Sequence, residues 1–297
     1  MLRSVLADWP DLPYRNLQVA PLETLVEMSQ ASMENDEIII ESSGQGAAAW
    51  CALPWDSDNF GVRMARLDLL WTRNEDPGRM GGLLDQVLQD LRGRGIQHLA
   101  YRTDMARIVT IRLLEERGFR LVDGLHTLCC GPQPFHPGLA VRDYRPSDRD
   151  ALLAMAAAGF QRTHTRYGSD PHLDPWKAAE TYVRWTENCL SGQRGDWVGV
   201  RVLEGEPVGF IACLLHRLRD EPEPVTVGVI DILAVHAQFQ GRGVGVDLVR
   251  AAQNWLGARS TLLTTGTRCD NAQAIAMFTR AGYRIHSSKV GVHAWLG

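Results

Sequence analysis

A glycine-rich hexapeptide between a predicted strand and a predicted helix limits what the second half of this chain can fold into. Its residues are Gln240-Gly241-Arg242-Gly243-Val244-Gly245. The segment 225–235 before it alternates apolar residues like a central strand, and the segment after it has the apolar spacing of an amphipathic helix. Glycine amides beside a helix N-terminus can converge on an anion, so the junction predicts a pyrophosphate-binding loop. The alternative is an ordinary glycine-rich turn, because short motifs also occur by chance.

The rest of the second half has the pattern of an α/β domain. Helices are expected at 148–160, through Tyr182 and Trp185, and from Asn271, a good N-cap, to Gly282, a natural C′ residue. Further strands are expected at 197–203, 208–215, 261–267 and 283–295.

The first half repeats part of this plan. A strand–helix–strand–helix order is expected at 66–71, 80–91, 96–102 and 108–117. Aligning the halves places Ile111, Leu114, Gly118, Phe119 and Arg120 on Ile275, Phe278, Gly282, Tyr283 and Arg284. We therefore predict an internal duplication, with domains 1–136 and 137–297 and a breaker-rich linker at 130–138.

The counterpart hexapeptide of the first half, 78–83, is poorly suited to a phosphate. Gly78 stands in place of Gln240, and Leu83 stands in place of Gly245. A leucine side chain would crowd the close approach of the backbone that a phosphate requires. The first half is therefore predicted to be degenerate and structural, helping to shape the ligand-binding cleft, while only the second half binds the phosphate-bearing ligand.

Two motifs of the second half resemble the GNAT superfamily of N-acetyltransferases. Gln240, Gly243 and Gly245 match the family signature Gln/Arg-x-x-Gly-x-Gly/Ala, and the segment 271–283 is similar to its Asn-x-x-Ala-x-x-x-Tyr-x-x-x-Gly-Phe segment. The resemblance covers residues 138–297. It implies an α/β fold of two GNAT-like halves, each a mixed, mostly antiparallel sheet flanked by helices, and an acyltransferase that uses acetyl-CoA or another acyl-CoA.

The resemblance also implies where the acyl-CoA would bind. Backbone groups of Leu233 and Val235 would pair with the pantetheine arm, amides of residues 239–245 would hold the pyrophosphate, and Asn271 would touch the cofactor. The expected cofactor-binding residues are Leu233, Val235, Gln240, Gly241, Arg242, Gly243, Val244, Gly245, Asn271 and Phe278.

Phe278 departs from the family pattern, because many members have a tyrosine there as general acid to the leaving thiolate. Coenzyme A is a tolerable leaving group near pH 8 and could depart without an acid. Tyr167, Tyr182 and Ser287 are other candidate donors, and loss of activity is a further alternative.

Acylation of an amine needs a route for the amine's proton, because a free alkylammonium has a pKa of roughly 10. Asp231 has the same strand parity as Leu233 and is expected near the thioester, as the catalytic base. The alternative is a salt bridge at the strand end. His236, and after it His216, are the other candidate bases because imidazole titrates near neutrality, although each is also expected at the surface.

A closer resemblance is to sugar-nucleotide acetyltransferases of the dTDP-fucosamine type. It rests on Pro54-Trp55-Asp56-Ser57, on Phe60-Gly61, and on the segment from residue 160 to 188. It implies a primary amine of an amino sugar or sugar nucleotide as acceptor, bound by Arg166, Tyr167, Asp170 and Trp185. For Trp55, Phe60 and Trp185, ordinary core packing is the alternative. An aminoglycoside-like or other natural-product amine, and a silent acyl-CoA-binding regulatory module, are the rival functions.

Composition argues against several other classes of protein. The net charge of −4 disfavours a nucleic-acid partner, and no apolar run approaches the roughly 20 residues of a membrane span. The N-terminus is too acidic for a signal peptide. The six cysteines lack metal-like spacing and predict reduced thiols with no metal site. We expect a cytoplasmic enzyme with a small-molecule acceptor, with a homodimer left open.

Overall fold

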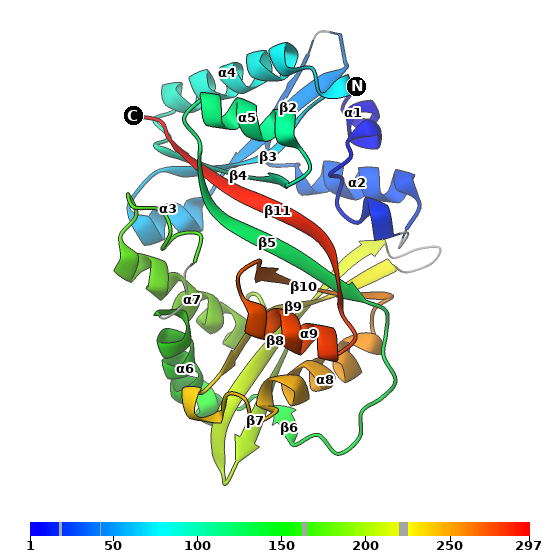
Figure 1. The fold of residues 1–297 in the computed structure, drawn as a ribbon, viewed down its shortest axis with the longest axis vertical. Helices are drawn as coiled ribbons and strands as arrows, with labels where there is room; N and C mark the ends of the chain where they lie inside the picture. The colour runs from blue at the N-terminus through cyan, green and yellow to red at the C-terminus, as the bar shows by residue number, and fades with distance from the viewer. Residues whose placement is uncertain (18–19, 42, 162–164, 220–224) are drawn as a thin grey trace. The chain divides into compact units, whose positions relative to one another are not determined.

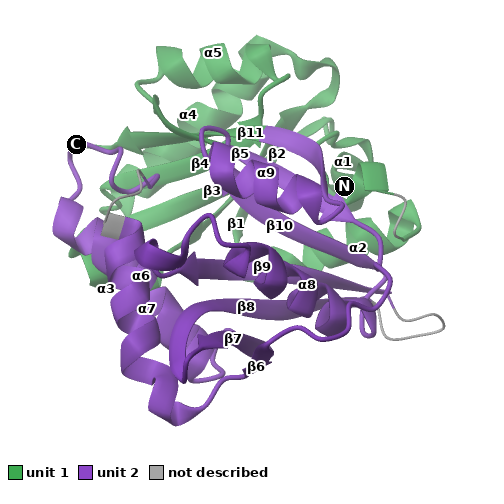
Figure 2. Cartoon of the chain, turned by 60° about the horizontal axis from the view of Figure 1, so that its bottom comes forward, with its two compact units in different colours: residues 1–124, 289–297 green, residues 125–288 purple. Residues whose placement is uncertain are grey.

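The computed structural model describes the chain except at residues 18–19, 42, 162–164 and 220–224. It contains two compact units, of which the first joins Met1–Gly124 with Lys289–Gly297 and the second is Leu125–Ser288 (Figure 2). The chain passes between the units within β5 (Arg120–Cys130) and again within β11 (Arg284–Trp295). Among the described residues, no helix has the length and apolar composition needed to cross a bilayer.

The second unit is built on a mixed sheet with the strand order β5-β10-β9-β8-β7-β6 (Figure 1). Among the strand pairs described for this unit, β9 and β10 run parallel, and the pairs β10–β5, β9–β8, β8–β7 and β7–β6 are antiparallel. This arrangement confirms the expected mixed, mostly antiparallel sheet. The strands are β6 (Val141–Asp143), β7 (Trp197–Leu203), β8 (Glu206–Arg219), β9 (Val225–Val235) and β10 (Leu262–Arg268).

Helices cover both faces of this sheet, and strand periodicity explains how. Along β8, Ile211 and Cys213 pack in the core with α8 and α9, whereas Phe210 and Ala212 pack in the core with α6 and α7. Successive side chains of a strand point to opposite faces, so one apolar strand serves two cores. The helices are α6 (Arg149–Gln161), α7 (Pro175–Leu190), α8 (Val244–Gly257) and α9 (Ala272–Arg280).

The first unit repeats this plan with the strand order β1-β2-β3-β4-β11. Helices α4 and α5 pack in one core with Ala48, and α1 and α2 pack in another core with Ala47 and Ala49. The strands are β1 (Glu37–Ile40), β2 (Gly46–Ala52), β3 (Met64–Thr72) and β4 (His98–Asp104). The helices are α1 (Leu2–Asp8), α2 (Leu22–Ser32), α3 (Pro54–Phe60), α4 (Pro77–Gly93) and α5 (Ile108–Glu116).

Matching irregularities relate the two halves of the sequence. Asp231 is the extra residue of a β-bulge in β9 opposite β8, and Asp68 is the extra residue of a β-bulge in β3 opposite β2. Helices α5 and α9 have nine residues each and follow the equivalent strands β4 and β10. Bulges are specific features rather than noise, so their equivalence supports the duplication.

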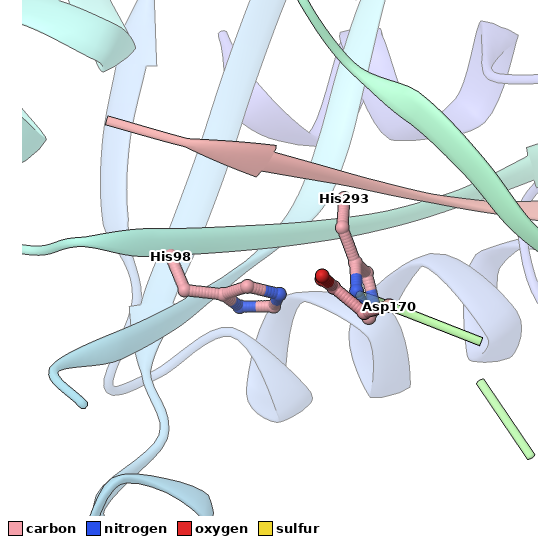
Figure 3. A group of neighbouring side chains, drawn as sticks. All are labelled: His98, Asp170 and His293. Atoms are coloured by element: carbon pink, nitrogen blue, oxygen red, sulfur yellow. The ribbon is translucent and has the colours of Figure 1, made fainter. Parts of the chain in front are cut away.

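The last strand of each sequence half belongs to the other unit. Residues 125–130 of β5 pair with β10, and residues 289–295 of β11 pair with β4. The compact units therefore differ from the sequence division into 1–136 and 137–297. The exchange also brings two histidines from distant parts of the chain together: the buried rings of His98 on β4 and His293 on β11 meet edge to face, with centroids 4.3 Å apart (Figure 3).

Candidate functional site

The two parallel strands of the second unit separate beyond Ile230 and Thr265. Their ladder ends at this pair, although β9 continues to Val235 and β10 continues to Arg268. The Thr265 hydroxyl donates a hydrogen bond to the Ile230 carbonyl over 3.1 Å and closes the last paired step. Beyond it, the main-chain groups of β9 that face β10 are not used by the β9–β10 ladder.

Leu233 and Val235 direct their main-chain groups to this unpaired side of β9. The His236 amide donates to the Val208 carbonyl of β8 over 2.9 Å, which orients His236 toward β8. Because orientation alternates along a strand, residues 233 and 235 face the opposite way. The Gln240 side-chain amide donates to the Val235 carbonyl over 3.2 Å. The remaining groups suit an extended ligand that pairs with β9 as a short strand would.

The hexapeptide forms the junction of β9 and α8, as the sequence predicts. Gly241 and Gly243 have φ of +76° and +85°, values that side-chain-bearing residues rarely adopt, and an added Cβ at either would meet nothing within 4 Å. Gly243 is the N-cap of α8, whose first amides have no intrahelical acceptor. Exposed amides, open space and the positive end of a 14-residue helix together fit a phosphate group.

Gly245 also has a role in helix packing, beside the one expected. A Cβ added there would lie 2.6 Å from Sδ of Met277 on α9. This glycine therefore permits close packing of α8 against α9. Its absence of a side chain is explained by helix packing as much as by approach of a phosphate.

The two other expected cofactor contacts lie on α9. The Asn271 carboxamide oxygen accepts from the Ala274 amide over 3.1 Å and caps the helix, so its NH2 group remains to meet a ligand. Phe278 is 4% exposed and packs edge to face against Tyr283, with ring centroids 5.4 Å apart. The Phe278 ring thus belongs to the core beneath α8.

In the first unit, the counterpart of the loop lies inside a helix. Helix α4 begins at Pro77, three residues before the predicted start, so residues 78–83 are helical. Its N-cap is Asp76, whose carboxylate accepts from the Arg79 amide over 2.8 Å. The carboxylate occupies a first-turn amide and repels an anion, which gives the degenerate half a physical cause beyond the bulk of Leu83.

Asp231 lies at the bulge, directly after the last paired residue of β9, and its side chain is 7% exposed. Arg194 donates to it twice, from Nε to Oδ2 over 2.8 Å and from Nη2 to Oδ1 over 3.0 Å. Trp185 Nε1 donates to Oδ2 over 2.6 Å, and the Cys189 thiol lies 3.7 Å from the same oxygen. Both carboxylate oxygens therefore accept hydrogen bonds within the second unit, as in the expected alternative of a salt bridge.

Aromatic rings from α6 and α7 stack next to this carboxylate. Phe160 lies on Tyr182 with centroids 4.2 Å apart, Tyr182 lies on Trp185 at 5.7 Å, and the Arg194 guanidinium lies 4.7 Å from the Trp185 ring. The stack and the ion pair form one half-buried surface over the bulge of β9.

The other expected acceptor contacts lie in the segment between α6 and α7. Tyr167 and Asp170 are buried, and Tyr167 accepts a hydrogen bond of 2.5 Å from Arg166, whose guanidinium also lies over its ring. The Asp170 carboxylate accepts from the His172 amide over 3.0 Å. These contacts are local to residues 166–172. Of the four expected acceptor residues, Trp185 is the one with a described hydrogen bond to Asp231.

Of the two candidate histidines, His236 lies away from the bulge, whereas His216 is near enough to Asp231 and Arg194 to interact with their charges. His236 is exposed, and its ring nitrogen accepts from the Gln238 amide over 3.4 Å as the N-cap of a short 3₁₀ turn, Ala237–Phe239. It follows Asp231 by five positions along extended chain, which corresponds to about 16 Å. Burial lowers the pKa of His216, so this imidazole stays neutral near pH 7.

The first unit holds a second group of polar side chains around its own bulge. Asp36, Cys51 and Asp68 each place one potential metal-ligand atom within 4.8 Å of the others. Arg66 already pairs with Asp68, over 2.5 and 3.1 Å. The guanidinium supplies one positive charge to the group, while the buried Oδ2 of Asp36 has no hydrogen-bond partner among the described residues.

Residues 159–283 match the family model described as the acetyltransferase (GNAT) family. Among curated proteins, the chain is 29% identical over 153 residues to the spore coat polysaccharide biosynthesis protein SpsD of Bacillus subtilis, covering 51% of this chain and 49% of that protein. It is 28% identical over 177 residues to dTDP-fucosamine acetyltransferase of Escherichia coli, covering 59% of this chain and 71% of that enzyme. The chain thus spans about half the length of the Bacillus protein.

The fold is also found in a solved structure with two such halves. The tandem GNAT protein from the clavulanic acid biosynthesis pathway superimposes with a TM-score of 0.56 at 15% identity, covering 99% of this chain and 95% of that one. At this identity the likeness concerns the fold alone, and it confirms the expectation of a tandem architecture.

Proposed function

Residues 159–283 belong to the GNAT acetyltransferase family, and from this premise we propose that the chain transfers an acetyl group from acetyl-CoA to a primary amine. The observation that supports this most is the meeting of two features at one end of β9. The strand separates from β10 after Ile230, and the left-handed glycines 241 and 243 follow it directly. A thioester whose tail lies along β9 would have its phosphates at the N-terminus of α8.

Each part of this arrangement has a task in the proposed reaction. The amides between Gly241 and Gly245 would hold the pyrophosphate, with Gln240 and Arg242 at the edge of the loop. Main-chain groups of Leu233 and Val235 would hold the pantetheine arm, and the Asn271 carboxamide would approach the same arm. Acetyl-CoA supplies the activated acyl group, and the bulge at Asp231 re-aims the strand where the thioester would lie.

Asp231 is proposed as the group that receives the acceptor amine and its proton. It lies at the bulge, whereas His236 is about five strand residues away, roughly 16 Å, and caps a turn. Phe278 offers no proton to the leaving thiolate, so coenzyme A would depart as the thiolate, which its pKa near that of cysteine, roughly 8.5, makes tolerable.

The proposed acceptor is the amine of an amino sugar or sugar nucleotide. Two of the similar proteins bear names from polysaccharide or fucosamine chemistry. The Trp185 indole donates to Asp231 and the Tyr182 ring stacks on Trp185, and aromatic faces suit the C–H faces of a pyranose. Arg166, Tyr167 and Asp170 would complete the acceptor side.

The test is calorimetric binding of acetyl-CoA followed by release of coenzyme A thiol over a panel of amines. The panel contains hexosamines, an amino-sugar nucleotide and an aminoglycoside. Binding with thiol release in the presence of a sugar amine supports the proposal. Absence of acetyl-CoA binding refutes it, and binding without thiol release from any amine supports a silent module, for which Phe278 is the motivating residue.

A further inference from the structure

The two partners of the Asp231–Arg194 ion pair differ in how they are held. The side chain of Asp231 is 7% exposed and comes from the centre of the sheet, whereas that of Arg194 is 47% exposed. Arg194 lies in the turn after α7, where its backbone amide donates to the Asn188 carbonyl over 2.9 Å. The carboxylate is thus part of the framework, and the guanidinium reaches it from the surface.

We infer that Arg194 occupies the subsite of the acceptor's ammonium group and is displaced from Asp231 when an amine acceptor binds. The inference rests on the proposed function, which puts the acceptor amine at the bulge of β9. It assigns to Arg194 a role in selecting the acceptor rather than in the chemical step.

Charge balance determines what can displace Arg194. If the guanidinium leaves without a replacement, the donors that a nearly buried carboxylate keeps among the described residues are the Trp185 indole N–H and the weak Cys189 thiol, which is strongly unfavourable. A primary ammonium brings one positive charge and three N–H donors, enough to replace both bonds from Arg194. An alcohol of the same shape brings one O–H and no charge. The exchange therefore selects protonated amines over hydroxyl groups.

The displaced side chain has a favourable position to move to. The Arg194 guanidinium already lies 4.7 Å from the Trp185 ring, and half of the side chain is in contact with water. It can keep its cation–π contact or become hydrated while the indole N–H continues to hold Asp231. Displacement thus requires little rearrangement beyond the ion pair.

Arg194 competes with the acceptor for Asp231. The apparent dissociation constant of the acceptor therefore rises as the fraction of molecules in which Arg194 is displaced becomes smaller. Arg194→Gln removes the charge and keeps a side chain of similar polarity. We expect about a threefold to tenfold fall in the apparent dissociation constant for a primary ammonium in this variant. Arg194→Lys retains the competing charge and should lie between this variant and the natural protein.

The matched control is Arg259. Its guanidinium lies 4.6 Å from the Trp255 ring, so it makes the same kind of arginine–tryptophan contact, but its described hydrogen bond goes to a backbone carbonyl. Arg259→Gln should leave ammonium binding unchanged.

The experiment follows the Nε–H resonance of Arg194 by ¹⁵N–¹H NMR in the full chain, with the signal assigned by its loss in Arg194→Gln. Cyclohexylammonium chloride is the probe, cyclohexanol is its neutral isostere, and sodium chloride at equal ionic strength controls for screening. We expect the ammonium alone to shift or broaden the Arg194 signal, with the Arg259 signal unmoved. An Arg194 signal that stays constant up to high ammonium concentration, or that responds equally to cyclohexanol, overturns the inference.

Acetyl-CoA binding, measured separately, distinguishes this inference from the proposed function. If acetyl-CoA binds and the Arg194 signal ignores the ammonium, the transferase proposal stands and the inference is wrong. If acetyl-CoA does not bind but the ammonium displaces Arg194, the cation subsite exists without the proposed reaction. Tighter ammonium binding in Arg194→Gln, with normal thermal unfolding, further supports displacement, and weaker binding in that variant refutes it.

Discussion

Restoring the family's tyrosine at position 278 tests which environment that ring occupies. Phe278 is 4% exposed, packs edge to face on Tyr283 at 5.4 Å, and belongs to the core under α8. A hydroxyl added at the para position of a ring in this core would lose its hydration. If it finds no partner, the cost is about 1–3 kcal/mol.

The expected result of Phe278→Tyr is therefore a destabilised protein. For a unit of this size, each kcal/mol corresponds to about 2–4 °C of melting temperature, so the melting temperature should fall by about 2–12 °C. Thermal unfolding with and without acetyl-CoA measures it, and thiol release under the same conditions reports turnover. The substitution should not speed acetyl transfer, because the ring faces protein.

Tyr283→Phe is the matched control in the same core. Tyr283 is fully buried and its hydroxyl lies beside the Cys130 thiol, and burial raises its pKa well above the usual range. Removing this hydroxyl, which has no hydrogen-bond partner among the described residues, should leave stability unchanged or raise it by up to about 3 kcal/mol. A Phe278→Tyr protein with unchanged melting temperature and faster turnover would mean that the ring faces the cofactor sulfur, and the reasoning from burial would be wrong.

Three further predictions follow from other parts of the chain. Gly243→Ala and Gly118→Ala place a Cβ at similar positive φ with nothing within 4 Å, so their strain should match, but calorimetry should find weaker acetyl-CoA binding only for Gly243→Ala. Burial, and to a lesser extent the charge of Asp68, raises the pKa of Asp36 from 3.8 to about 6. Between these pH values the folded state keeps the Asp36 proton that the unfolded state loses, so the free energy of unfolding falls as the pH rises from about 4 to about 6. After allowance for solvent screening, Asp36→Asn should raise the free energy of unfolding by about 1–2 kcal/mol at pH 7.5 and by little below pH 4. Urea unfolding at both pH values measures this, and equal gains at the two would contradict it. A fragment 138–297 lacks the strand that pairs with β10 and should not unfold cooperatively by circular dichroism, so a fragment as stable as the full chain would contradict the exchange of strands.

The second half of the fold was predictable because its strands and helices have clear periodicity and end signals. The helix expected from Asn271 to Gly282 is Ala272–Arg280, capped by Asn271. The first 60 residues gave no such signal. Strand β2, Gly46–Ala52, consists largely of alanines buried on both faces, and a strand covered on both faces has no alternation to detect.

The exchange of strands could not be predicted from sequence. Strands β5 and β11 occupy equivalent positions in the two repeats, and their partners β10 and β4 are equivalent as well. Each of the two strands could therefore pair with either partner. Local patterns and turn residues are unaffected by the choice. Only the tertiary pairing decides it, because pairing energies depend on residues far apart in the chain.

The parts of the candidate site that consist of main-chain groups could be predicted from sequence. The parts formed by side chains from distant segments could not. The glycine loop and the unpaired main chain at Leu233 follow from a motif. Strand parity fails at Asp231, because the bulge turns its side chain toward Trp185 and Cys189 of α7, whereas Leu233 packs with α8 and α9 on the other face. Arg194 lies in the turn Ser191-Gly192-Gln193-Arg194-Gly195, which contains no catalytic pattern. Its role depends on a fork of hydrogen bonds to Asp231, 37 residues away.

The two repeats share the bulged aspartate but differ in the surroundings that chemistry requires. In the first unit, Asp68 pairs with Arg66 two residues earlier on the same strand, so its cation is built into the sheet. In the second unit, the cation comes from a surface turn and can leave. The phosphate side differs more, because the equivalent of the loop is inside α4, where a Cβ on Gly81 would lie 2.6 Å from the Arg117 guanidinium. Replacing the capping Asp76 alone would therefore not create a second acetyl-CoA site, since the amides of residues 80–83 would still follow the helix and its neighbours would still fill the space.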